Sequence, residues 1–408
     1  MFKAVIAGYS RSPFSMARKG ELIDVKPVNL LADVINNLVT KSKVIREDIE
    51  DIVVGCAFQT GEQSFNIGKL VTFLTDMDIK TSGMTVDRWC GSSMEGIHVA
   101  AGKIAMGSGK VFVCVGVESM TIVNTGDDFV HLGLKICPDI DTIIYTLADL
   151  VDQKRGWGLK DESWNFLDKT KLLGGEGWFN LGDNDLATHV HRTQCLAQGE
   201  DLASITKSLA SSFGVETKLV PMTNDIVSTI VETPEGDLAF QHYFVRDRCL
   251  PTVKGFRFEG IKSSVINPLI QEYARENDKS AVLLAPSNPF VSIDPILNVP
   301  TMTEELVGMK GPKIAISPII NSKAVKGPAA KMMQELGVPS TSIEIANHYK
   351  ELIDAIVIDH ADAALSAKIE DMGIKVFITN TVMHSLNEKI TLANECINFI
   401  EAYWENRW

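Results

Sequence analysis

Residues 116–129, GVESMTIVNTGDDF, join two α/β patterns with no linker-like stretch between them. Before the join, KVFVCVGV (110–117) is a nearly continuous apolar run, typical of a strand buried on both faces. After it, TIVN (121–124) is again strand-like and leads into a turn with two acids. The sequence therefore predicts two units, residues 1–120 and 121–408, that meet at Met120–Thr121.

Strands and helices alternate through both units. In the first, apolar runs predict strands at 3–8, 48–56, 81–89 and 110–117, and helical periodicity predicts helices at 28–39, 65–74 and 91–109. In the second, a mainly helical stretch (155–215) precedes strand-like runs at 217–222, 225–233 and 237–245. Strand and helix then alternate to the end, with strand-like apolar runs at 313–320, 355–360 and 375–380. The predicted fold class is α/β: a half-domain, then a Rossmann-like, doubly wound α/β domain with a helical and β insert.

Composition narrows the classes of function. The chain has 408 residues and a formal net charge of −13, whereas binding nucleic-acid phosphates needs a basic surface. The seven cysteines include no CxxC pair, which argues against a disulfide framework or a zinc site. No apolar run has the length of a signal peptide or a membrane span. We therefore expect a cytoplasmic protein without nucleic-acid or membrane partners.

Cys90, in VDRWCGSSMEGIH (86–98), lies at a predicted strand-to-helix elbow. Helix N-terminal N–H groups stabilise a thiolate there and make it nucleophilic, although an isolated cysteine of this kind is more often a small buried residue. The surroundings favour the nucleophile, because residues 1–120 resemble the N-terminal half of thiolases. The matching stretches are AVIAGYSRSPF, EDIEDIVVGCAFQTGEQ, TVDRWCGSSMEGIHVAAGKIAMGSG and VGVESM. The resemblance implies acyl-CoA as a partner and Cys90 as the acyl-accepting residue.

The thiolase-like site lacks its acid–base partners. Thiolases carry a His in a GHP motif and a second Cys in a CxG motif of their second domain, and neither motif occurs after residue 120. Asp87 also stands where the family usually has Asn. We therefore interpret Cys90 as a relic or a reactive thiol rather than a working thiolase centre.

Four acids gather in the second unit, within NTGDDF and CPDIDT: Asp127, Asp128, Asp139 and Asp141. Clustered carboxylates suit Mg²⁺ bound with a phosphorylated substrate, or hydrogen bonds to a polar ring. Any single one of them has the simpler interpretation of a turn residue or a helix N-cap. The pattern predicts a Mg²⁺ site at Asp127, Asp128 and Asp139.

Further polar residues follow predicted strands, where open α/β sheets bind ligands. PSNP (286–289) carries Ser287 and Asn288 in a stiff loop, although an ordinary turn has the same composition. ISPII carries Ser317, and Lys326 precedes a predicted helix whose N-terminus could meet a phosphate.

His189 and His191 lie two residues apart in a predicted helix. At this spacing the two side chains point to different faces of the helix, which is unsuitable for a metal pair. We interpret them as packing or surface residues.

From about Thr121 to the C-terminus, the chain resembles the 2-phospho-L-lactate transferase family of coenzyme F-420 biosynthesis. The matching stretches are TGDDFVHLGLKICPDIDTIIYTLADLV, GWGL, GEGWFNLGDNDLATHVHRT, PMTNDIVSTIVET, FQHYFV, APSNPFVSIDPIL, AISPII and VKGPAAKMM. The family implies Mg²⁺-dependent transfer of a lactyl-phosphate or enolpyruvyl-phosphate group from a guanosine diphosphate-linked donor to a deazaflavin precursor, with release of GMP. By motif position, Asp141 would hold the deazaflavin, and Ser287 and Asn288 would lie in the nucleotide pocket. The other predicted substrate-binding residues are Thr142, Asn180, Ser317 and Lys326.

The chain departs from this family in three places. Asn180 stands where the family usually has Arg or Lys, and Asn224 where it usually has Asp. The family also begins with a strand, a glycine-rich loop and a helix before the strand that corresponds to TIVN. That loop approaches the donor phosphates with its backbone N–H groups. Here the thiolase-like unit replaces it, which should leave an open edge in the sheet unless KVFVCVGV fills the place.

Three hypotheses follow. The transferase works with an altered phosphate site; or the thiolase-like half works as an acyl-CoA enzyme with catalytic groups from a partner chain; or the chain is a recombined product with neither activity. We favour the first, because most of the transferase pocket is present. Both families commonly form dimers, so a homodimer is expected.

Overall fold

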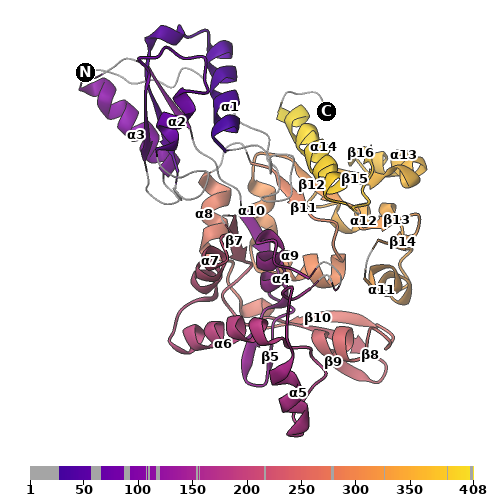
Figure 1. Cartoon of the computed structure of the whole chain (residues 1–408). Helices are drawn as coiled ribbons and strands as arrows, with labels where there is room; N and C mark the ends of the chain where they lie inside the picture. Colours follow the sequence, from indigo (N-terminus) through magenta and orange to yellow (C-terminus); the bar gives the residue numbers. More distant parts are fainter. Residues whose placement is uncertain are drawn as a thin grey trace. The chain divides into compact units, whose positions relative to one another are not determined.

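The computed structural model describes residues 27–56, 66–86, 92–106, 108, 111–115, 120–152, 155, 157–215, 217–276, 280–325, 327–383, 385–404 and 408. The chain forms two compact units, Met1–Ser119 and Met120–Trp408 (Figure 1). Among the described residues, every helix is too short or too polar to cross a membrane.

The first unit is built on a three-stranded parallel sheet in the order β2-β1-β3. Its strands are β1 (Ile49–Gly55), β2 (Ser82–Val86) and β3 (Val111–Val115), and its helices are α1 (Pro27–Ser42), η2 (Arg46–Asp48), α2 (Ile67–Thr72) and α3 (Ser92–Ala105). The central strand β1 is almost wholly buried, as the apolar run IEDIVVG predicts. Apolar residues of α1, α2, β1 and β3 form the core of this unit.

Two glycines let α2 lie against β2. A Cβ on Gly68 would collide with the backbone of Met84, and a Cβ on Gly83 would collide with the backbone of Gly68. Helix and strand therefore approach more closely here than any side chain would allow.

The second unit begins with the parallel pair β4 (Met120–Val123) and β7 (Lys218–Pro221). Between these strands lie the hairpin β5 (Phe129–His131) and β6 (Leu134–Ile136), then α4 (Pro138–Leu147), α5 (Asn165–Leu172), α6 (Asp183–Ala197) and α7 (Leu202–Ser212). Residues of α4 and α7 pack with Val123 and Leu219 in one apolar cluster, so these helices cover the strand pair. The predicted helix at 141–152 thus begins earlier, at Pro138, and ends at Leu147.

An antiparallel sheet in the order β10-β8-β9 follows, which is the β part of the predicted insert. Its strands are β8 (Ser228–Thr233), β9 (Gly236–Ala239) and β10 (Gly255–Glu259), after which come η5 (Ile261–Ser263) and α8 (Pro268–Glu276). The strand predicted at 237–245 is wrong in its second half. Residues His242–Arg246 form the short helix η4, which buries Tyr243 in an apolar cluster with Val231 and Met332.

A four-stranded parallel sheet in the order β11-β12-β15-β16 completes the second unit. Its strands are β11 (Val282–Leu284), β12 (Lys313–Ile316), β15 (Ala355–Asp359) and β16 (Lys375–Thr379). Around it are η6 (Pro289–Ile293), α9 (Asp294–Leu297), α10 (Met302–Gly308), β13 (Ile319–Ile320), β14 (Lys323–Ala324), α11 (Ala329–Glu335), α12 (Ser342–Tyr349), η7 (His360–Leu365), α13 (Ser366–Glu370) and α14 (Leu386–Trp404). Helix α14 covers one face and α12 packs on the other (Figure 1). This confirms the predicted α/β class with helices on both faces of parallel strands.

The parallel strands of the second unit do not form one continuous sheet. In the described part of the chain, β4 pairs only with β7, and β11 pairs only with β12. Both edges nevertheless face a shared core, because Ile122 of β4 and Leu284 of β11 belong to the same apolar cluster. The sheet is interrupted where a central strand would join the two parts.

Strand β3 does not fill this interruption. It pairs with β1 in the first unit, in parallel register. Only residues 116–119 separate β3 from β4, whereas a parallel neighbour needs a crossover of about a dozen residues or more. The expectation that KVFVCVGV could replace the transferase's first strand is therefore wrong.

Candidate active site

The carboxyl end of β4 carries the first group of predicted residues. Residues 124–128 leave the strand in a turn in which Asn124 Oδ1 accepts a hydrogen bond from the Gly126 N–H at 2.8 Å. The Nδ2 of Asn124 donates to Asp139 Oδ2 at 3.0 Å and to the Val291 carbonyl at 3.3 Å. Asp139 lies in the first turn of α4, and Val291 lies in η6, just after the PSNP loop. One amide side chain therefore links the end of β4 to α4 and to η6, the helix that follows β11.

The acids beside this link are largely withdrawn from water. Asp127 and Asp128 are buried, and Asp139 is half-buried. Burial, and next the carboxylate of Asp139, hold the pKa of Asp127 well above its ordinary value, and burial raises the pKa of Asp139 to about 6. The Oδ1 atom of Asp127 is buried and has no hydrogen-bond partner among the described residues. A buried carboxylate oxygen without a hydrogen-bond partner is a suitable ligand for a hard divalent cation.

Asp128 has a different environment. Its Oδ2 lies 3.2 Å from Lys135 Nζ and accepts a hydrogen bond from the Cys137 thiol at 3.0 Å. Burial raises the pKa of Asp128, and Lys135 opposes that shift. Asp128 thus already has a cationic partner, whereas Asp127 forms no ion pair with any residue in the described part of the chain.

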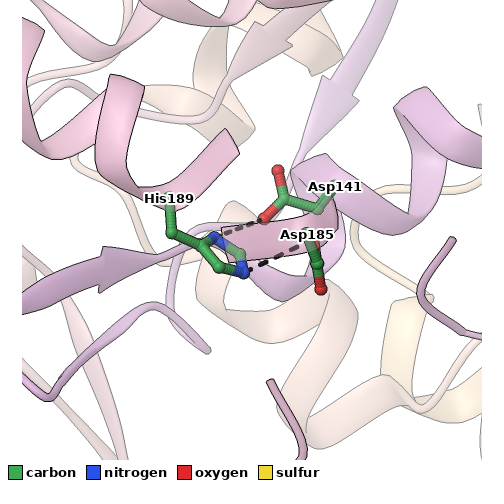
Figure 2. A group of neighbouring side chains, drawn as sticks. All are labelled: Asp141, Asp185 and His189. Atoms are coloured by element: carbon green, nitrogen blue, oxygen red, sulfur yellow. Dashed lines mark ion pairs between the residues drawn. The ribbon is translucent and has the colours of Figure 1, made fainter. Parts of the chain in front are cut away.

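The structure assembles a different group of three possible metal ligands. Among the described residues, Asp141, Asp185 and His189 have donor atoms that all lie within 4.8 Å of one another. Figure 2 shows the two ring nitrogens of His189 directed at one carboxylate each. Nδ1 lies 3.6 Å from Asp141 Oδ2, and Nε2 lies 3.4 Å from Asp185 Oδ1. Asp127, Asp128 and Asp139 do not form such a compact set of three.

The contacts of Arg192 indicate whether these three residues form a metal site. Its two terminal nitrogens donate to the two oxygens of Asp141, Nη1 to Oδ2 at 3.1 Å and Nη2 to Oδ1. Nη1 also lies 3.3 Å from His189 Nδ1. A guanidinium, which never loses its charge, already supplies the cation that the buried carboxylate of Asp141 needs. We therefore assign the group to an internal hydrogen-bonded network rather than to a metal centre.

Two of the predicted substrate-binding residues, Asn288 and Ser317, make side-chain hydrogen bonds within the protein. Asn288 Oδ1 accepts from the Phe290 N–H at 3.0 Å and caps η6, while its Nδ2 donates to Met332 Sδ at 3.1 Å. Ser317 is buried at the end of β12 and shares a hydrogen bond of 3.1 Å with Ser342 Oγ. Ser287 is half-buried in the loop after β11. Of these three residues, only Ser287 makes no side-chain hydrogen bond to another described residue.

Two other predicted substrate-binding residues are at least partly exposed. Asn180 is exposed in the segment before α6, and Thr142 is half-buried on α4 next to Asp141. Trp178 and Phe179, which precede Asn180, form an aromatic group with Phe129, with ring centroids 5.0 to 5.9 Å apart. Cys90 and Lys326 lie outside the described residues.

The sequence analysis missed Arg192 and Asp185 and interpreted His189 as packing or surface. The signal was present as D185-x3-H189-x2-R192, a spacing that places all three on one face of a helix. That face contacts Asp141 and Tyr145 of α4, so His189 and Arg192 are buried and Asp185 is half-buried.

The second unit has parallel strands in an α/β arrangement, buried carboxylates directly after β4, and a contact from Asn124 to η6, which follows the PSNP loop. Open α/β sheets of the doubly wound class bind ligands at such strand ends. Residues 107–391 match the sequence model of the family 2-phospho-L-lactate transferase CofD, and the chain belongs to this family. Residues 4–154 also match the thiolase N-terminal domain. The two matches overlap at 107–154, around the predicted join. The sequence prediction of both families is thus confirmed.

The relatives that this chain resembles have names of two kinds, 2-phospho-L-lactate transferase and phosphoenolpyruvate transferase. The 2-phospho-L-lactate transferase of Methanosarcina barkeri is 37% identical over 286 residues, which cover 70% of this chain and 91% of the relative. That of Methanococcoides burtonii is 37% identical over 281 residues, covering 69% and 90%. The phosphoenolpyruvate transferase of Streptomyces coelicolor is 35% identical over 290 residues, covering 70% and 90%.

Proposed function

We propose that the second unit transfers a lactyl-phosphate or enolpyruvyl-phosphate group from a guanosine diphosphate-linked donor to the deazaflavin precursor of coenzyme F-420. An acceptor hydroxyl oxygen attacks the phosphorus that carries the lactyl or enolpyruvyl group. The phosphoanhydride bond to GMP breaks, and GMP leaves. Membership of the transferase family and the names of its relatives support this reaction class.

The observation that carries the proposal is the contact made by Asn124. It brings the acids after β4 within hydrogen-bonding reach of the segment that follows the PSNP loop. A donor bound at PSNP and an acceptor bound at α4 would therefore meet beside Asp127 and Asp139. Phosphoryl transfer depends on this kind of positioning and on charge stabilisation.

Mg²⁺ is the cofactor we propose, held by Asp127 and Asp139, with Asp128 beside them. The buried, unpartnered oxygen of Asp127 and the raised pKa of both Asp127 and Asp139 fit a site that is short of positive charge. When bound, the ion would neutralise charge on the diphosphate. Asn124 orients Asp139, and Lys135 holds Asp128 in place.

A single-turnover assay with Mg²⁺, either donor and the deazaflavin acceptor tests the proposal. We expect phosphodiester product and GMP by mass spectrometry, and a loss of at least about 100-fold in rate for Asp127→Asn, since that change replaces an anionic ligand of the proposed Mg²⁺ with a neutral amide. Asp237→Asn, at an exposed ion pair on β9, is the matched control and should not change the rate. If the folded native chain gives no product with either donor, the hypothesis that the recombined chain lacks this activity becomes the better account.

Asn180→Arg should tighten acceptor binding by about tenfold, because a guanidinium makes charge-assisted hydrogen bonds that an amide cannot. The dissociation constant is measured by titrating the deazaflavin fluorescence. Asn387→Arg adds the same charge at an exposed position on α14 and serves as the control. Equal affinities for native chain and Asn180→Arg would remove Asn180 from the acceptor site.

A further inference from the structure

The contact between α4 and α6 is made by polar side chains where apolar ones would be expected. Asp141 and Tyr145 project from α4, and Asp185, His189 and Arg192 project from one face of α6. The Arg192 side chain is fully buried, and Asp141 is 5% exposed. Burying an ion pair costs desolvation, and apolar residues of similar volume are often as stabilising. Stability alone therefore does not explain this arrangement.

The contacts of Arg192 fix the Asp141 carboxylate in space. Two parallel N–H···O bonds hold the plane of the carboxylate as well as its position. His189 supports the same carboxylate from the side, at 3.6 Å. Behind His189, Asp185 faces its Nε2 at 3.4 Å and accepts a hydrogen bond of 2.6 Å from the Tyr145 hydroxyl. Asp185 and Tyr145 thus restrict the movement of the His189 ring, and His189 and Arg192 restrict the movement of the Asp141 carboxylate.

We propose that Arg192 is a positioning residue for acceptor binding: it holds the Asp141 carboxylate in the one orientation that meets the acceptor, with His189 as its lateral support. The inference rests on the proposed function, in which Asp141 contacts the deazaflavin. Each carboxylate oxygen has two lone-pair sites, so Asp141 can serve Arg192 and a ligand at once. Arg192 itself is buried behind Asp141 and does not touch the acceptor.

Arg192→Lys tests orientation separately from charge. Lysine keeps the positive charge but has no planar fork, so it cannot hold both oxygens of Asp141 in a fixed plane. We expect the variant to fold and to raise the KM for the acceptor at least about tenfold, with the KM for the donor unchanged. Arg257→Lys, in the exposed ion pairs of β10, is the matched control and should leave both KM values at the native level.

A double-mutant cycle shows whether Arg192 acts through Asp141. If it does, Asp141→Asn combined with Arg192→Lys should be no worse for acceptor KM than Asp141→Asn alone. Independent, additive losses would overturn the inference, and so would equal loss of donor and acceptor affinity, which indicates general misfolding. If Arg192→Lys misfolds, the same cycle is measured with Asp141→Asn and His189→Gln. Additive increases in acceptor KM in that cycle would also overturn the inference. A native chain with no affinity for the deazaflavin would remove the proposed function itself, whereas native affinity with no effect of either variant would remove only the positioning role.

Discussion

Asp141→Ala is expected to lower the free energy of unfolding of the second unit by about 3–5 kcal/mol, because it leaves the fully buried guanidinium of Arg192 without a counter-charge. The guanidinium of arginine is not deprotonated in proteins, so Arg192 stays charged when its partner is removed. Urea unfolding, followed by tryptophan fluorescence, measures the effect.

A second substitution distinguishes charge from packing. Asp141→Ala combined with Arg192→Met removes both charges and keeps an apolar side chain of similar length. The double variant should recover most of the lost stability. If it is as unstable as the single variant, packing of the α4–α6 contact matters more than the uncompensated charge. Both variants should bind the acceptor more weakly than the native chain, because Asp141 is absent from both.

Restoring the missing segment should have the largest effect on activity. Replacing residues 1–119 with the strand, glycine-rich loop and helix of a family relative should raise the single-turnover rate by about 100-fold or more. The loop's backbone N–H groups would be aimed at the donor phosphates, and the loss of even one such donor can cost that much in other enzymes. The added strand would also pair with the edges of β4 and β11, which have no strand partner on that side in the described part of the chain.

The control graft keeps the strand and the helix but replaces the loop glycines with valine. This graft restores the strand pairing of the sheet. Its valine side chains keep the loop backbone away from the donor phosphates. We expect it to raise stability without raising the rate. Equal rates for the two grafts would show that the sheet, not the phosphate loop, limits the reaction. No gain from either graft would mean that the donor is bound elsewhere on the second unit.

Much of the local structure could be predicted from periodicity. Apolar runs of strand length at 48–56, 313–320, 355–360 and 375–380 became β1, β12, β15 and β16, because strands buried on both faces must be apolar throughout. Residues 237–245 were misassigned, since an apolar run of this length is equally compatible with a short helix. Tyr243 of that helix is fully buried, and tertiary packing decides its conformation.

The candidate site was only partly predictable. Acids after β4 and the PSNP loop could be found, because polar residues directly after apolar strands mark the ligand-binding edge of such sheets. The role of Asn124 could not, because Val291 and Asp139 are far from one another in sequence and meet only through the fold. Arg192 was missed for the same reason: its partner Asp141 lies on another helix.

The sequence by itself determined that two α/β families are joined near residue 120, since the motifs of each are local and ordered along the chain. It also located the acids that follow β4. Only the tertiary structure decided that β3 stays with β1, that the transferase sheet is interrupted between β4 and β11, and that Asp141 is held by Arg192. The physical reason is that strand pairing and buried charge pairing join residues distant in sequence, and local patterns do not encode which distant residue becomes the partner.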